Sequence, residues 1–92
     1  MANKNSTNNK KRDMIHEAKK RPCVDCGNTY PYYVMDLDHL PQYIKSFSLG
    51  KYIQHTLEEV AVEITKCEAV CANCHRIRTH ARGYYNQLRF AK

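Results

Sequence analysis

The sequence has no long apolar segment anywhere in its 92 residues. Residues 1–12 are mainly Asn, Lys and other polar residues, so they predict neither a signal segment nor a membrane anchor. We therefore expect a cytoplasmic protein that makes no contact with a membrane. No internal repeat occurs either, which argues against solenoid and array architectures.

The sequence also lacks the even number of cysteines that a disulfide framework favours. It contains five, and in a reducing compartment Cys-x-x-Cys pairs are typical of metal ligands. A chain of this length forms one small domain with a marginal core, burying only somewhat over ~60% of its unfolded surface. Such domains commonly need a metal ion or disulfides. We expect a metal ion here.

Acidic residues are scarce at both ends of the chain. Residues 1–22 carry seven Lys and Arg against two acids, and residues 66–92 carry six against one. Residues 23–65 have the opposite balance, with two Lys and Arg against six acidic residues. This distribution indicates that the basic ends of the chain bind a polyanion and that carboxylates of the middle segment bind a metal ion. The alternative for the N-terminus is a basic tail that serves solubility alone.

The first half of the chain predicts little regular structure. Residues 1–12 have no apolar periodicity, so we expect a disordered basic tail. A short helix is expected from Asp13 as N-cap to the residue before Pro22. Residues 32–38 predict a strand on which Asp36 and Asp38 share a face. Residues 40–50 predict a loop, and Ser48 is placed to cap a turn over residues 51–54.

The second half predicts two helices. Thr56 and Glu59 form a capping-box pattern. An apolar stripe follows that is typical of a core-facing helix, with a solvated face opposite; the stripe is Leu57, Val60, Ala61 and Ile64, and the face is Glu58, Glu59 and Glu63. A last helix is expected over residues 72–82 and ends at Gly83. Residues 84–92 form a C-terminal tail, expected to fold back on the domain.

Two Cys-x-x-Cys pairs predict a structural zinc site. The four thiols are Cys23, Cys26, Cys71 and Cys74, the set that a tetrahedral zinc ion prefers. Gly27 and Asn28 tolerate the positive φ that a tight turn after the first pair needs. Cys67 competes with Cys71, because Cys67-x-x-x-Cys71 is also a permitted ligand spacing; we favour Cys71 and Cys74 and expect Cys67 to be a buried spare thiol. Cys-x-x-Cys-His is also typical of c-type haem attachment, but that attachment requires export of the protein.

The residues around these pairs carry a family resemblance. Asp38 and His39 are followed by Cys71, Cys74, His75 and Arg76 in an order that resembles zinc-containing HNH endonucleases, the small freestanding kind of phage and bacterial genomes. The likeness covers about residues 22–82. It implies a small α+β, zinc-stabilised ββα-metal (His-Me finger) nuclease domain over residues 13–83, with flanking helices. The cytoplasm would be that of a bacterium or, for a phage protein, of its host.

The resemblance also implies roles for single residues. His39 would be the general base that deprotonates a water, and Asp38 and His75 would hold one divalent cation. That cation is expected to be Mg²⁺ or Mn²⁺, with Ni²⁺ or a second Zn²⁺ as alternatives. Asp36 would orient a ligand from outside the coordination shell. The reaction would be hydrolysis of DNA phosphodiester bonds, most naturally in duplex DNA.

The sequence departs from the family at the central Asn. Lys66 stands at that position, where it could face a phosphate, and Asn73 lies between two cysteines instead. His80 is expected to be a solvated residue near the helix end. The predicted phosphate contacts lie on or near the last helix, and they are Arg76, Arg78 and Arg82.

A rival function belongs to a different class. The same fold could serve a non-catalytic zinc-ribbon DNA-binding or adaptor protein that assists a larger phage nuclease or packaging machine. Asp38, His39 and His75 favour the nuclease, because a pure binding module does not need them. The sequence indicates no particular protein partner.

Overall fold

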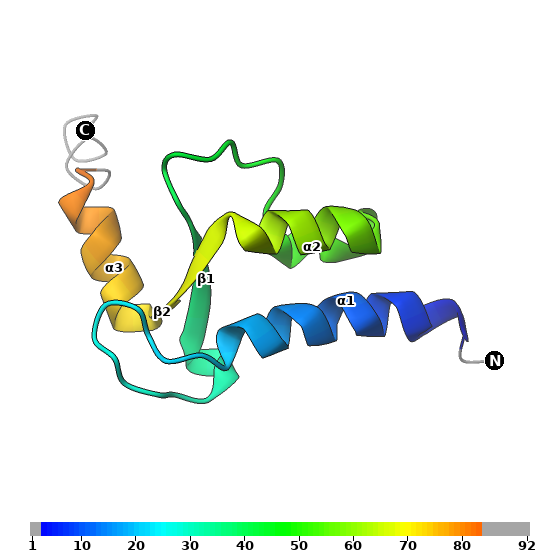
Figure 1. The fold of residues 1–92 in the computed structure, drawn as a ribbon, viewed down its shortest axis with the longest axis horizontal. Coiled ribbons are helices and arrows are strands. Elements are labelled where there is room, and N and C mark those ends of the chain that lie inside the picture. The colour runs from blue at the N-terminus through cyan, green and yellow to red at the C-terminus, as the bar shows by residue number, and fades with distance from the viewer. Residues whose placement is uncertain (1–2, 84–92) are drawn as a thin grey trace, which may run out of the picture.

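The computed structural model describes residues 3–83, and side chains from residue 6 onward. The protein is a small α+β unit built round a two-stranded antiparallel sheet. Along the chain the elements are α1 (Asn3–Lys19), η1 (Tyr32–Val34), β1 (Met35–His39), η2 (Leu49–Gln54), α2 (Leu57–Thr65), β2 (Cys67–Cys71) and α3 (Ala72–Ala81). Helices α1 and α2 lie side by side at one end, and α3 lies across the sheet from them (Figure 1).

The first helix is much longer than the sequence predicted. It begins at Asn3 rather than at Asp13, so the expected disorder of residues 3–12 is wrong. Tertiary contacts account for the difference. Lys11 is 4% exposed, and its Nζ donates to the carbonyls of Ile53 (3.4 Å) and His55 (2.7 Å). These carbonyls lie at the end of η2, where the short helix leaves its own acceptors unpaired.

The predicted strand over residues 32–38 is corrected in its first half. Tyr32–Val34 form a single 3₁₀ turn that follows Pro31, and the strand begins at Met35. β1 then pairs with β2 in a register that places Met35 opposite Cys71 and His39 opposite Cys67. The residues predicted no strand at Cys67–Cys71, and the family resemblance implied a ββα core without placing its second strand.

The second helix follows its sequence pattern closely. Glu59 N donates to Thr56 Oγ1 and Thr56 N donates to Glu59 Oε1, so the capping box is confirmed. Val60 from the stripe is fully buried. Glu63 is also buried, with 1% of its surface exposed, so its assignment to the solvated face is wrong. It lies three residues after Val60 and therefore on the core side.

The third helix begins and ends as predicted. It runs from Ala72 to Ala81 and stops at Gly83, whose φ of 80° only glycine adopts readily. Ser48 occupies the N-cap position of η2, although its side chain makes no capping bond. The predicted tail at residues 84–92 lies outside the described residues.

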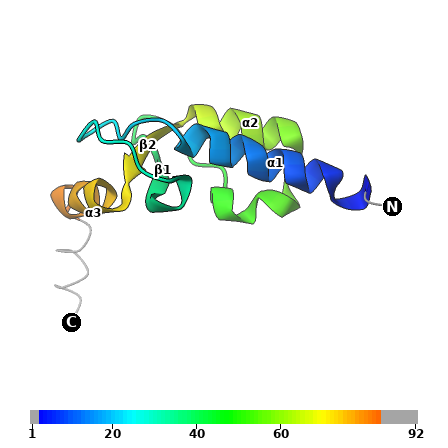
Figure 2. The ribbon, with the colours of Figure 1, turned by 90° about the horizontal axis from the view of Figure 1, so that it is seen from below.

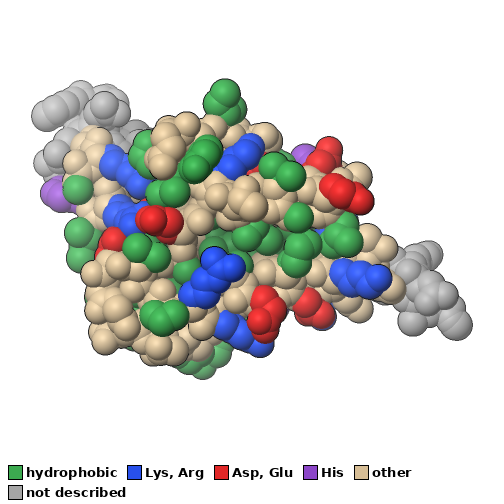
Figure 3. All heavy atoms as spheres, in the orientation of Figure 1, with side chains coloured by type: hydrophobic (Ala, Val, Ile, Leu, Met, Phe, Trp, Pro, Cys, Tyr) green, Lys and Arg blue, Asp and Glu red, His purple; other side chains and the backbone are tan. Residues whose placement is uncertain are grey.

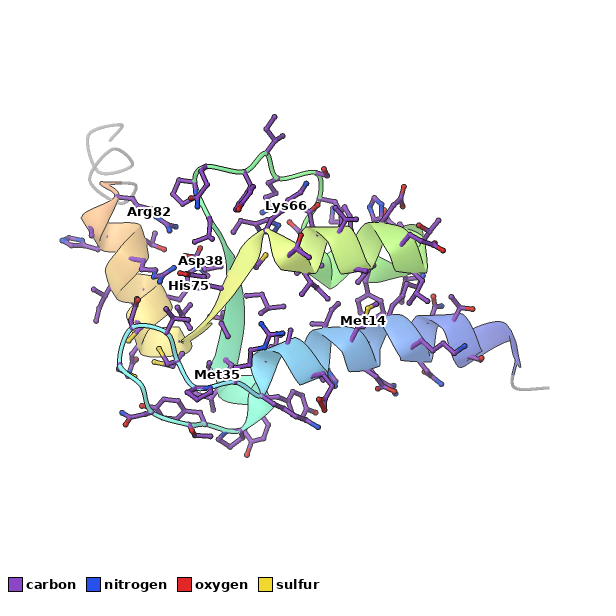
Figure 4. The ribbon with its side chains drawn as sticks, in the orientation of Figure 1. Met14, Met35, Asp38, Lys66, His75 and Arg82 are labelled. Atoms are coloured by element: carbon purple, nitrogen blue, oxygen red, sulfur yellow. The ribbon has the colours of Figure 1, made fainter. Side chains whose placement is uncertain are left out.

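Two apolar clusters meet at the sheet. One contains Met35 and Val70 and surrounds the cysteines, and the other joins Ile15, Leu49 and Val60 between the helices. Leu37 packs against both. Figure 2 shows η2 against one side of the α1–α2 pair, and Figure 4 shows Met14 between these two helices. None of the described helices is long and apolar enough to cross a membrane.

Candidate metal centre and catalytic site

The four predicted cysteines converge at one end of the sheet. The sulfur atoms of Cys23, Cys26, Cys71 and Cys74 all lie within 4.8 Å of one another. Zinc–sulfur bonds of about 2.3 Å place the sulfurs of a tetrahedral site roughly 3.8 Å apart, so the set needs little contraction to bind the ion. Cys67 lies outside the group, its Sγ 3.5 Å from the Glu63 carbonyl. The structure thus groups Cys74, and not Cys67, with the other three cysteines.

Backbone N–H groups surround the cysteine sulfurs. Cys23 Sγ accepts from the amides of Cys26 (3.5 Å) and Cys71 (3.3 Å), and Cys71 Sγ accepts from Cys74 N (3.4 Å). Burial alone would raise the pKa of Cys23, but the amides of Cys26, Cys71 and Asp25 lower it to about 6. The Cys71 sulfur, and then burial, raise the pKa of Cys74 to about 12. Four crowded thiols therefore need a bound cation before all of them ionise.

The first cysteine turn is fixed to the sheet by backbone bonds. Val24 N donates to the carbonyl of Ala69 at 3.0 Å, which joins the turn to β2. Gly27 N donates to Cys23 O at 2.8 Å, and Gly27 adopts a φ of 77°. The positive φ predicted for Gly27 is thus confirmed, whereas no described residue other than glycine adopts one. These bonds fix the position of the first cysteine pair relative to β2.

His75 lies between the two aspartates of β1. Its Nδ1 is 3.0 Å from Asp36 Oδ2, and its Nε2 is 3.4 Å from Asp38 Oδ1. Asp36 and Asp38 therefore share a face of the strand, as predicted. α3 supplies the imidazole from its first turn, and Figure 4 shows His75 and Asp38 facing each other across the gap between helix and strand.

Asp38 is buried in a cluster of charges. Its Oδ2 accepts from Arg78 Nη1 at 2.8 Å and from Arg82 Nη2 at 2.9 Å, and its side chain is 6% exposed. Burial would raise the pKa of Asp38, but the hydrogen bonds from Arg82 and Arg78 lower it. The predicted metal ligand therefore already has two guanidinium partners. A divalent cation at these oxygens would meet two positive charges.

His39 faces a different partner. Its Nε2 is 2.8 Å from Glu63 Oε2, and Glu63 also accepts from Ser46 N (2.9 Å) and Lys66 Nζ (3.0 Å). Burial would raise the pKa of Glu63, yet bonds from Lys66, Ser46 and His39 lower it to about 2. Glu63 is thus a carboxylate that can only accept hydrogen bonds, so the His39 proton resides on Nε2. The lone pair of His39 is then on Nδ1.

One cleft brings the two groups together. It has a volume of about 380 Å³, and Asp36, His39 and His75 all line it. Further residues from α1, β1, η2 and the segment between β1 and η2 complete its walls: Arg12, Ile15, His16, Lys19, Leu37, Lys45, Ser48, Leu49, Gly50 and Tyr52. Asp36 and His39 are three positions apart in β1 and so belong to opposite faces of the strand, yet both line the cleft.

The basic residues predicted to contact DNA have different surroundings. Arg78 binds Asp25 twice at 2.7 Å, as well as Asp38 and Glu68, so the fold already uses its guanidinium. Lys66 binds Glu63 and the Ile44 carbonyl and Ser46 hydroxyl of the preceding loop. Arg76, Asn73 and His80 are exposed on α3, and the side chain of Arg82 is 40% exposed beside Asp38.

Sequence reasoning missed two features of this site. The first is Glu63, which could have been found because a carboxylate at the third position after Val60 falls within the apolar stripe. The second is the basic lining of the cleft, contributed by Arg12, Lys19 and Lys45. No local pattern joins α1 to residue 45, since only the tertiary fold brings them together.

Comparisons of the chain with protein-family models, with curated proteins and with solved structures give no match. The function of the chain is therefore inferred from its own residues and their geometry.

Proposed function

We propose that the protein hydrolyses phosphodiester bonds of DNA with the help of a divalent cation, as an HNH-type endonuclease. The observation that carries this proposal is the cleft, which holds a general-base candidate and a carboxylate–imidazole pair within one volume of about 380 Å³. The order β1, β2, α3 agrees with a ββα-metal core, since the strands supply Asp36, Asp38 and His39 and the helix supplies His75.

His39 is suited to accept a proton from water. Ionised Glu63 keeps the proton on Nε2 and fixes the ring, as the carboxylate does in a catalytic triad. Nδ1 is then free to take the proton of an attacking water. Glu63 is buried and accepts hydrogen bonds from Lys66 Nζ and Ser46 N. These bonds hold its carboxylate in place, and the carboxylate in turn orients the His39 ring.

Asp36 and His75 are the residues that best fit a cation. The Nδ1–Oδ2 separation of 3.0 Å matches two neighbouring vertices of an octahedral ion, whose ligands at 2.0–2.1 Å lie roughly 3 Å apart. The Asp36 side chain is 43% exposed, whereas Asp38 is buried against two arginines. We therefore assign the ligand role to Asp36 and a structural role to Asp38. When bound, Mg²⁺ or Mn²⁺ would neutralise charge on the phosphate oxygens.

Nicking of supercoiled plasmid by zinc-loaded protein tests the proposal. We expect nicking that requires added Mg²⁺ or Mn²⁺ and falls by roughly 10²-fold or more in His39→Ala. Unchanged zinc content and melting temperature in that variant show that the fold survives. If neither protein nicks DNA but both bind it in a salt-dependent way, the non-catalytic zinc-ribbon or adaptor function replaces the nuclease.

A second pair of variants separates the two aspartates. Asp36→Asn is expected to abolish metal-dependent nicking while leaving the free energy of unfolding close to that of the wild type. Asp38→Asn is expected to destabilise the fold, because Arg78 and Arg82 lose their buried counter-charge. If instead Asp36→Asn nicks normally, and Asp38→Asn stays folded but is inactive, the metal role belongs to Asp38, as the family resemblance implies.

A further inference from the structure

The cleft face of α1 carries a row of basic residues. Arg12, His16 and Lys19 follow one another at intervals of four and three residues, so they lie on one side of the helix. All three line the cleft, and Lys45 lines it from the loop between β1 and η2. Asp36 is the one carboxylate among the described residues of this lining.

Some cations in the described part of the chain are already bound by other groups of the fold. Lys11, Lys66 and Arg78 are bound to carbonyls or carboxylates of the fold. In the described part of the chain, no carboxylate lies within ion-pair distance of Lys19 or Lys45. Arg12 pairs with its neighbour Asp13 at 3.2 Å, and its side chain is 45% exposed. Exposed pairs of this kind contribute little, so the guanidinium is available to another anion.

The remaining surface of α1 has mixed charge. The groove between α1 and α2 is lined by Lys10, Lys20 and Arg21 together with Asp13 and Glu17. On the face shown in Figure 3, Lys or Arg and Asp or Glu side chains are interspersed along α1. The lining of the cleft, with three Lys and Arg against one carboxylate, is therefore more positive than this groove and favours an anion there.

We propose that the cleft face of α1, together with Lys45, binds the phosphate backbone of one DNA strand and leads it to His39. The identity of the polyanion rests on the proposed function, because the same lining contains Asp36, His39 and His75. Lysine and arginine contacts to phosphates fix position without reading bases, so this surface confers no sequence preference. The DNA contacts thereby move from α3, where the sequence placed them, to α1.

DNA binding by the His39→Ala protein tests this surface without interference from cleavage. The affinity for a short DNA duplex is measured at several salt concentrations with Arg12→Ala, Lys19→Ala and Lys45→Ala added singly. Each added substitution is expected to lower the slope of log Kobs against log salt by about one, the effect of losing one phosphate contact. Unchanged melting temperatures establish that the variants fold.

Lys10→Ala is the matched control for Lys19→Ala. Lys10 is exposed on the same helix but lies roughly 160° round from Arg12, outside the cleft lining. It should leave the salt slope unchanged. The proposal is overturned if Lys10→Ala weakens binding as much as Lys19→Ala does, or if the three cleft substitutions leave binding unaltered.

Failure of the α1 binding surface can be distinguished from failure of the proposed nuclease function. Nicking by the wild type with normal binding by all cleft variants would overturn the α1 surface and leave the nuclease intact. Loss of salt-dependent binding in the cleft variants, without nicking by the wild type, would support the surface and overturn the nuclease.

Discussion

Asp25 and Asp38 bind the same guanidinium, that of Arg78. Asp25 lies in the turn between the first two cysteines, and its two oxygens are each 2.7 Å from Arg78. Asp38 lies on β1 and accepts from Arg78 at 2.8 Å. The hydrogen bonds from Arg78 are the main reason that the pKa of Asp25 lies below its usual value. One side chain of α3 therefore ties the cysteine turn to the strand that carries the site.

Replacing Arg78 should destabilise the protein strongly. Arg78→Ala leaves Asp38 buried with one partner fewer, and breaking such a pair costs about 3 kcal/mol or more in the free energy of unfolding. Arg78→Lys should recover little of this, because an ammonium cannot reproduce the forked contacts. Urea unfolding of zinc-loaded protein, followed by circular dichroism, gives the values.

Arg76→Ala is the control on the same helix. Arg76 is exposed, so its loss should change the free energy of unfolding by no more than about 0.5 kcal/mol. Equal stability of the two alanine variants would mean that the Arg78 contacts contribute nothing to folding.

Replacing single cysteines should distinguish the zinc ligands from Cys67, which lies outside the cluster. Cys71→Ser is expected to lose zinc and cooperative unfolding, because a structural zinc site supplies on the order of 10–16 kcal/mol of apparent binding energy. Cys67→Ser should keep one zinc per chain, since Cys67 lies outside the cluster. Zinc content by elemental analysis and thermal melting are the readouts. Zinc loss from Cys67→Ser alone would reverse the assignment.

Glu63 should make stability depend on pH in the acid range. Its pKa falls from 4.5 in the unfolded chain to about 2 in the folded state, so its stabilisation is complete above pH 4.5 and is lost as the pH falls towards 2. The stability difference between wild type and Glu63→Gln should therefore be constant above pH 4.5 and shrink below it. Both proteins carry the same cysteines, so acid release of zinc affects them equally. A difference that does not vary with pH would contradict the buried carboxylate.

The same variant should slow the reaction without weakening DNA binding. A glutamine amide can donate to Nε2 and favour the His39 tautomer whose Nδ1 carries the proton. We expect nicking to fall on the order of 10-fold or more while the Kd for DNA stays unchanged. A parallel loss of binding would instead indicate that the loop held by Glu63 has moved.

The cap of α2 offers a test of the helix itself. Thr56→Ala removes the acceptor of Glu59 N and should cost about 1 kcal/mol in the free energy of unfolding. Thr65→Ala at the other end of α2 makes the same chemical change where no cap is lost, and its effect should be close to zero. Urea unfolding distinguishes the two, and similar losses in both would argue against the capping box.

The sequence predicted the features that depend on local spacing. Each Cys-x-x-Cys pair, the Thr56 capping box and the Gly83 stop follow from patterns within a few residues. The capping box and the stop are confirmed, and the two cysteine pairs converge into a group that could hold a metal ion. Features set by distant contacts were missed. Residues 3–12 contain too little apolar surface to predict a helix, yet the buried ammonium of Lys11 helps fix them to η2.

Charged residues were the hardest to assign for the same reason. Its position on the last helix predicted that Arg78 contacts a phosphate. In the structure Arg78 binds three carboxylates from two strands and a turn, and no local pattern predicts them: Asp25, Asp38 and Glu68. Glu63 looked solvated because glutamate usually is, but the loop at Ser46 covers it.

The pairing of β1 with β2 fixes the spacing between the cysteine cluster and His39. Cys71 lies opposite Met35 and belongs to the cluster, and Cys67 lies opposite His39, four residues earlier in β2. Deleting one residue between them would turn the remaining side chains of β2 to the opposite side and shift α3 by one step. His75 would then leave the aspartates, although the order of the cysteines in the chain would be unchanged. Length variation that preserves the site should therefore be confined to the loops and absent from this strand.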